Sequence, residues 1–228
     1  MPHDHPVASL IASAADGDFL APDGGWQRVE PWRAGLEAVI AFTGRAVFAI
    51  SPAIGDDELV ALGADGFGGA HDPRLVTAIA GPGAWIDSLD ALLVARGTGA
   101  PDVPARLVTR PDLRSHPRAV LAAELRDDVT VLGRPGDDDS SVATVGRGVG
   151  GLRELSFEVD PAQRGGAGTP LVRDALTTVS ADELVVAAVA PGNAASLRAV
   201  LGAGFTPIGS LQLFRREPRD VRPAAGTG

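Results

Sequence analysis

A glycine-rich loop between a strand-like and a helix-like segment is the strongest constraint on how this chain can fold. Residues 152–159 alternate polar and apolar side chains, as a half-buried strand does. Residues 169–179 have a helical pattern, and Pro170 suits the first helical position, where a backbone N–H has no partner. The loop between them, residues 160–168, holds three glycines. Its backbone N–H groups, with the helix dipole behind them, predict an anion site that phosphate oxygens can approach closely; an ordinary glycine-rich turn is the alternative.

A second glycine motif, GRGVGG, occupies residues 146–151 and has the spacing G-x-G-x-x-G. That spacing binds a dinucleotide only where a helix follows the loop. The segment that follows, residues 152–159, reads as a strand. We therefore expect GRGVGG to be the turn of a strand–turn–strand hairpin, and a nucleotide site there is almost excluded.

The segments around these loops predict an α/β chain of the α+β type, with a mixed, mostly antiparallel sheet and helices on both faces. We expect helices at 26–36, 56–67, 72–81, 116–126, 169–179 and 193–203, strands at 129–133, 142–146, 152–159 and 184–190, two short strands within 37–51, and a terminal hairpin at 205–216. The pattern of residues 85–97 fits a helix or a strand.

The Gly/Pro-rich stretch 97–105 is the expected domain boundary. We expect four parts: a flexible N-terminal arm (1–25), a smaller N-terminal α/β accessory domain that shapes an acceptor site (26–104), a second domain (105–217) and a disordered tail (218–228).

Composition excludes several classes of function. The chain has no Cys, so it has no disulfide, no thiolate metal site and no Cys nucleophile, which fits a reducing cytoplasm. A net charge of −9 argues against nucleic acid and anionic membranes as partners. No apolar run approaches the roughly 20 residues that span a bilayer. We expect a cytoplasmic protein without a metal, and we interpret His3 and His5 as part of a mobile terminus.

Two motifs resemble the GNAT superfamily of acyl-CoA-dependent N-acetyltransferases. Gln163-x-x-Gly166-x-Gly168 is similar to the family's pyrophosphate loop, and residues 190–205, with Asn193 and Ser196, are similar to its N-x-x-S/A…G-F element. The resemblance covers about residues 105–217. It implies a GNAT-like sheet and transfer of an acetyl group from acetyl-CoA to a small-molecule or peptide amine without an acyl-enzyme, and it allows a homodimer.

The resemblance also implies a set of coenzyme A-binding residues. These are Phe157, Val159, Gln163, Arg164, Gly165, Gly166, Ala167, Gly168, Thr169, Asn193 and Ser196. The strand that ends at Val159 should separate from the strand at 184–190 and expose its peptide groups to the pantetheine. Asn193 would bind the pantetheine or cap its own helix.

The catalytic residues that the resemblance implies are Glu154 as general base, with Glu158 as the alternative, and Ser196 near the sulfur. Many members have a Tyr as general acid seven residues after the Asn; this chain has Val200 there and no Tyr anywhere. A water relay or an unprotonated thiolate would replace it. A non-catalytic acyl-CoA-binding sensor therefore remains the alternative function. Residues 63–72, with Trp85, Asp87 and Asp90, would line the acceptor pocket or only form turns and helix ends.

Overall fold

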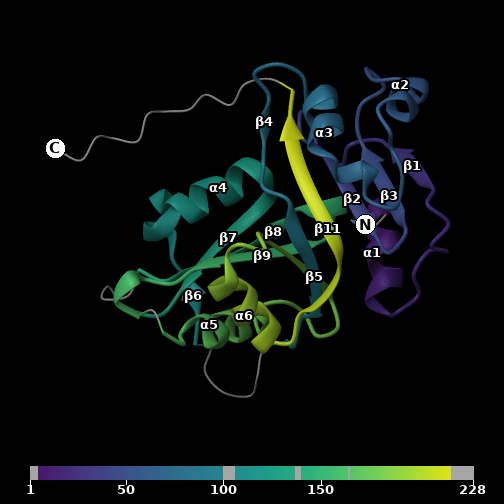
Figure 1. Cartoon of the computed structure of the whole chain (residues 1–228). Coiled ribbons are helices and arrows are strands. Elements are labelled where there is room, and N and C mark those ends of the chain that lie inside the picture. Colours follow the sequence, from purple (N-terminus) through teal and green to yellow (C-terminus); the bar gives the residue numbers. More distant parts are fainter. Residues whose placement is uncertain (1–4, 100–105, 137–139, 164, 217–228) are drawn as a thin grey trace. The chain divides into compact units, whose positions relative to one another are not determined.

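The chain forms two compact units that interleave along the sequence. The computed structural model describes residues 5–99, 106–136, 140–163 and 165–216. Unit 1 comprises residues 1–20 and 90–210, and unit 2 comprises residues 21–89 and 211–228. The chain therefore passes from one unit to the other after residues 20, 89 and 210 (Figure 1).

Unit 1 contains a mixed, mostly antiparallel sheet, which confirms the predicted fold class. Its described strands follow the order β5-β10-β9-β8-β7-β6. Only β9 and β10 pair in parallel; the other neighbours pair antiparallel. The strands are β5 (Asp90–Arg96), β6 (Val108–Thr109), β7 (Asp127–Gly133), β8 (Val142–Arg147), β9 (Arg153–Glu158) and β10 (Leu184–Val189).

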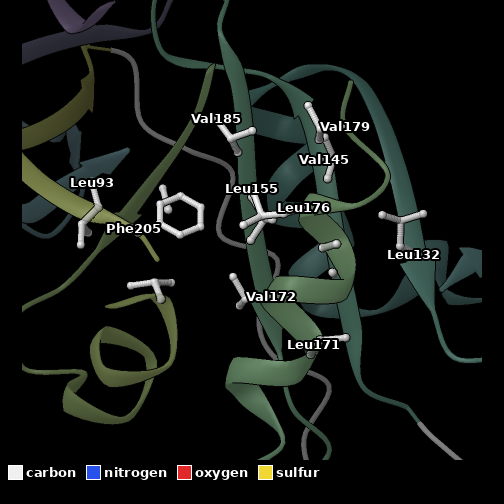
Figure 2. Packing of buried hydrophobic residues seen from close by; sticks show 14 of the residues in the cluster. Leu93, Leu132, Val145, Leu155, Leu171, Val172, Leu176, Val179, Val185 and Phe205 are labelled. Carbon is white, nitrogen blue, oxygen red and sulfur yellow. The ribbon is translucent and has the colours of Figure 1, made fainter. Parts of the chain in front are cut away.

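Helices cover both faces of this sheet. The helices of unit 1 are α1 (Pro6–Ala15), α4 (Pro117–Leu125), α5 (Gly168–Leu176) and α6 (Ala194–Gly202). Val142 packs in the same cluster as Ala119 of α4, whereas its neighbour Ala143 packs in a larger cluster with residues of α5. Successive strand residues point to opposite faces, so α4 and α5 lie on opposite sides of the sheet. The larger cluster, which includes Leu155, Val172 and Phe205, is the core of unit 1 (Figure 2).

Unit 2 is a smaller α/β unit with its own core. Its strands are β1 (Trp26–Val29), β2 (Glu37–Phe42), β3 (Arg45–Ala49), β4 (Trp85–Ile86) and the end of β11 (Thr206–Arg215), and its helices are α2 (Asp56–Ala61) and α3 (Pro73–Ala80). β2 and β3 are the two short strands that were predicted within 37–51, and they pair antiparallel on either side of Thr43-Gly44. Phe48 is fully buried and meets Trp26 edge to face, and Phe214 at the end of β11 is buried in the same cluster.

The N-terminal arm and two elements differ from the sequence predictions. The flexible arm is wrong over Pro6–Ala15, which form α1: His5 accepts a hydrogen bond from the Val7 amide at its start, and Ile11 is fully buried. The helix expected at 26–36 is wrong throughout: pairing with β3 makes 26–29 a strand, and residues 30–36 form no helix. The terminal hairpin is wrong because β11 runs unbroken through Gly209, which lacks the positive φ of a tight turn.

The domain boundary also differs from the prediction. Residues 90–96 form β5 of unit 1 and pair with β10 along its whole length, where Leu92 and Leu93 are fully buried. The division therefore falls before residue 90 and not at 97–105, because a buried strand pairing outweighs a local Gly/Pro signal. Most of the predicted boundary (100–105) and the tail 218–228 lie outside the described residues.

The GRGVGG motif is a strand–turn–strand connection, as predicted. β8 and β9 pair antiparallel on either side of a short 3-10 turn, Val149–Gly151. Gly150 and Gly151 have φ values of 60° and 80°, which L-residues rarely adopt.

Candidate ligand-binding site

A pocket of about 740 Å³ opens where β9 ends and where α5 and α6 begin. It lies wholly in unit 1. Ten of the predicted site residues line it together with four others, so the fold gathers most of the predicted set in one place. The lining residues are Arg118, Phe157, Glu158, Val159, Gly165, Gly166, Ala167, Gly168, Thr169, Asn193, Ala195, Ser196, Arg198 and Ala199.

The parallel strands β9 and β10 separate toward the pocket. Among the described residues they are paired only at Arg153 with Val185 and at Glu154 with Val186, although both strands continue further. The Asp160 amide donates to Ser141 Oγ at 3.0 Å, on the β8 side. Since backbone groups alternate in direction along a strand, the peptide groups of Phe157 and Val159 point to the β10 side, into the gap. The separation predicted from the sequence is therefore present.

The glycine loop at the start of α5 is open to a ligand. Gly165 and Gly166 have φ values of 106° and 139°, and a Cβ added at either position would meet nothing within 4 Å. No side chain of a described residue caps α5, whose N-cap residue is Ala167. The first N–H groups of a helix have no intrahelical partner, so the start of α5 presents donors and the positive end of the helix dipole.

Gly168 serves helix packing more than ligand approach. A Cβ there would lie 2.9 Å from Ala199 Cβ, closer than real contacts allow. Next to it, Thr169 Oγ1 donates to the Ala199 carbonyl at 3.2 Å. These contacts hold the N-terminus of α5 against α6 and fix the position of the loop.

Two arginines in the pocket were missed by sequence reasoning. Arg198 lies on α6, five residues after Asn193, so helical periodicity within the second motif could have suggested it. Arg118 lies on α4, and no motif connects it with the loop. Its Nε is 3.7 Å from Glu158 Oε2, which pairs the two charges loosely across the pocket wall. Arg164, which the resemblance implies as a coenzyme A-binding residue, lies outside the described residues.

Glu154 does not line the pocket, unlike Glu158. Its carboxylate is buried, with Oε1 2.5 Å from Arg126 Nη2 and with Oε2 accepting the Val149 amide at 3.1 Å. A Cβ at Gly148 would lie 1.8 Å from that oxygen, so GRGVGG encloses an internal carboxylate. Arg126 also donates to Ser156 Oγ at 2.8 Å. Catalysis by Glu154 stays a prediction, and the contacts of its carboxylate are those of a structural ion pair.

The second motif orders the start of α6. Asn193 Oδ1 accepts the Ser196 amide at 3.1 Å, which is the helix-cap role that the sequence allowed. Ser196 itself is half-buried in the pocket wall. Gln163 is exposed in a short 3-10 turn (Pro161–Gln163) and is not a lining residue. Val200 is fully buried in the core of unit 1, so no polar side chain replaces the missing Tyr at that position.

The other candidate features have local structural explanations. In unit 2, Asp65 Oδ1 accepts the amides of Phe67 and Gly69, which is the turn role that residues 63–72 allowed. His116 caps α4 by accepting the Arg118 amide. Within the described part of the chain, no group of three His, Cys, Asp or Glu residues could hold a metal ion. No helix there is long and apolar enough to cross a membrane.

Comparison with known proteins gives a distant likeness in structure alone. No protein-family model and no curated protein matches the sequence. Solved structures similar to the chain include a GCN5-related N-acetyltransferase from Kribbella flavida, at 15% identity and a TM-score of 0.37, with 63% of each chain covered. A protein of the GNAT family from Novosphingobium aromaticivorans has 19% identity and a TM-score of 0.39, over 59% of this chain and 68% of that one.

A third structure, an acetyltransferase from the GNAT family of Colwellia psychrerythraea, has 13% identity and a TM-score of 0.34, with 57% of each chain covered. The chain spans about three fifths of the length of the Kribbella protein. A likeness this distant assigns no activity, so the function has to be argued from the site itself.

Proposed function

We propose that the protein is an acyl-CoA-dependent N-acyltransferase that transfers an acetyl group from acetyl-CoA to a primary amine. The observation that carries the proposal is the single pocket that joins an open glycine loop at the start of α5 to the gap between β9 and β10. An anion site followed by a slit lined with free peptide groups matches a ligand with a pyrophosphate and a long amide-containing arm.

Each part of coenzyme A has a matching part of the site. The open backbone at Gly165 and Gly166 and the uncapped start of α5 suit the pyrophosphate. Arg198 also lines this pocket and adds a positive charge to it. The peptide groups of Phe157 and Val159 suit the amides of the pantetheine, which would extend the β9 edge like an added strand.

The transfer follows from these positions. The amine nitrogen attacks the thioester carbonyl, and the C–N bond forms as the C–S bond breaks. A backbone N–H on the gap side of β9, at Val159, would stabilise the charge that develops on the carbonyl oxygen. The amine gives up one proton, and the departing thiolate takes one. The products are an amide and free coenzyme A.

Glu158 is better placed than Glu154 to accept the amine proton. Glu158 lines the pocket and, among the described residues, makes only the loose contact with Arg118, whereas the Glu154 carboxylate is enclosed by Arg126 and the Val149 amide. We therefore assign the base to Glu158. Glu158→Gln should lower kcat at neutral pH by 10²-fold or more while coenzyme A binding stays unchanged.

The proton for the thiolate has no strong side-chain donor in the described pocket. Among the described lining residues, only Ser196 and Thr169 carry a hydroxyl, and Thr169 already donates to Ala199. We propose that water in the pocket supplies this proton and that Ser196 does no more than relay it. Ser196→Ala should therefore lower kcat by less than tenfold.

Calorimetric titration with coenzyme A, acetyl-CoA and NAD tests the assignment of the ligand. Gly166→Glu should abolish coenzyme A binding, because it places a carboxylate where the pyrophosphate would lie. Gly204→Glu is the matched control, since Gly204 also has positive φ and open space but lies outside the pocket wall. Absence of coenzyme A binding by the unaltered protein, or equal loss in both variants, would overturn the proposal.

The second candidate function is a non-catalytic acyl-CoA sensor. Val200 favours this function, because it is buried at the position where many GNAT members have a Tyr that acts as the general acid. Release of free thiol from acetyl-CoA in the presence of amines separates the two functions. Coenzyme A binding without any amine-dependent thiol release would favour the sensor.

A further inference from the structure

We propose that Arg118 binds a carboxylate of the amine acceptor, so that the protein prefers amines that also carry a carboxylate, such as amino acids. The proposal rests on the proposed acyl transfer and deepens it by naming the acceptor class. The sequence motifs gave no indication of Arg118.

Arg118 carries a buried donor that no described residue satisfies. Its Nε is shielded from solvent and has no hydrogen-bond partner among the described residues. The nearest carboxylate oxygen, Glu158 Oε2, is 3.7 Å away, which is too long for a hydrogen bond. Buried donors are almost always paired, and an unpaired one costs stability. A donor of this kind in a pocket wall points to an acceptor atom that a ligand supplies.

The position of Arg118 separates it from the proposed pyrophosphate site. A Cβ on Gly168 would lie 3.4 Å from Phe157 and 3.8 Å from Val159, so these side chains are on the α5 face of β9. Glu158 lies between them in sequence and therefore points to the opposite face, where it meets Arg118 of α4. The glycine loop and Arg118 thus approach the same pocket from the two faces of β9. A group held by Arg118 belongs to the substrate that enters opposite the coenzyme.

The charges of Glu158 and Arg118 are complementary to a substrate that carries both an amine and a nearby carboxylate. Glu158 can accept a hydrogen bond and a proton from the amine, and the Arg118 guanidinium can donate to a carboxylate in a charge-assisted contact. A carboxylate without an amine would meet repulsion from Glu158, and an amine without a carboxylate would leave the Arg118 donor unpaired. One molecule that carries both groups satisfies both side chains.

Matched acceptors test this selectivity. The twenty amino acids and their carboxamides are compared by thiol release from acetyl-CoA, since each pair differs only in the carboxylate. We expect kcat/KM to be at least tenfold higher for the preferred amino acid than for its amide. In Arg118→Gln this ratio should fall to about one, through a higher KM for the amino acid, while the Kd for coenzyme A stays unchanged.

Arg114→Gln is the control, because Arg114 is exposed four residues before Arg118 and does not line the pocket. It should keep the ratio of the unaltered protein. Equal use of amino acids and amides, or use of neither while coenzyme A binds, would overturn the proposal about Arg118 and leave the coenzyme site standing. No coenzyme A binding at all would instead overturn the proposed function.

Two further results would assign Arg118 to another anionic group and so overturn the proposal. A higher Kd for coenzyme A in Arg118→Gln would place a coenzyme phosphate on Arg118. A selective loss of succinyl-CoA binding, with acetyl-CoA binding retained, would place the carboxylate on the acyl chain and not on the acceptor.

Discussion

Glu154, which the sequence resemblance implies as a general base, forms a buried ion pair with Arg126 in the structure. Both side chains are buried, and Thr144 and Ser156 complete a polar network with them. Burying charges is costly unless each is paired, so the two residues depend on one another.

Arg126→Met should therefore lower the free energy of unfolding by about 3–5 kcal/mol, because it leaves the Glu154 carboxylate buried without a counter-charge. Denaturant titration followed by circular dichroism measures the change. The double variant Arg126→Met, Glu154→Leu should recover much of the loss. A single-variant effect below about 1 kcal/mol would mean that water compensates the carboxylate.

His71 gives unit 2 a sensitivity to acid. Burial lowers the pKa of His71 from its ordinary value of 6.5 to about 4. The folded protein therefore holds His71 neutral between these values, while the unfolded chain takes up a proton. Above pH 6.5, protonation of His71 does not lower the free energy of unfolding. As the pH falls from 6.5 toward 4, the free energy of unfolding decreases by roughly 3 kcal/mol at most.

The measurement is the free energy of unfolding at pH 7 and at pH 4.5, in the unaltered protein and in His71→Gln. The variant should lose less stability between the two pH values than the unaltered protein does. Equal losses would show that the imidazole is not what the acid affects.

At the scale of elements, the start of α6 separates two roles of Asn193. Its side chain caps the helix by accepting the Ser196 amide. Asn193→Ala should cost about 1 kcal/mol of stability, and Asn193→Asp should retain the cap. Calorimetric titration with coenzyme A then tests the other role. A higher Kd in both variants would indicate contact of Asn193 with the pantetheine. An unchanged Kd in both variants would mean that Asn193 only caps the helix.

Elements with a local signal could be predicted from the sequence, and elements made by distant pairing could not. The alternation in β9, Pro170 in α5 and the cap of α6 all act within a few residues, and each of these elements was predicted. β1 is a strand because of its parallel partner β3, and β5 is a central strand because β10 and a buried core lie against it. The same contrast holds in the pocket, where the loop glycines were predicted and Arg118, from a distant helix, was not.

At the scale of the whole molecule, the interleaved chain makes the two units hard to separate. A fragment of residues 105–217, the domain expected from the sequence, would lack β5. Strand β10 would lose its antiparallel partner along Ala91–Arg96, and the core would lose the side chains of Leu92 and Leu93. An unpaired, apolar strand edge favours aggregation.

We expect this fragment to show no cooperative thermal transition by calorimetry, and a fragment of residues 90–217 to regain one. The full chain is the reference for both. Cooperative unfolding of the fragment 105–217 at the temperature of the full chain would contradict the importance of β5.

The interleaving also sets an order of events during synthesis, because the chain leaves the ribosome from its N-terminus. Helix α1 packs against the turn at 149–151, so residues 6–15 must wait for a segment made more than a hundred residues later. Unit 2 waits longer, since Phe214 is fully buried in its core. Many proteins complete one domain while the next is being translated. In this protein neither unit can complete its core early. Most of unit 2 is synthesised before most of unit 1, but the core of unit 2 is completed only once residues 211–215 have emerged.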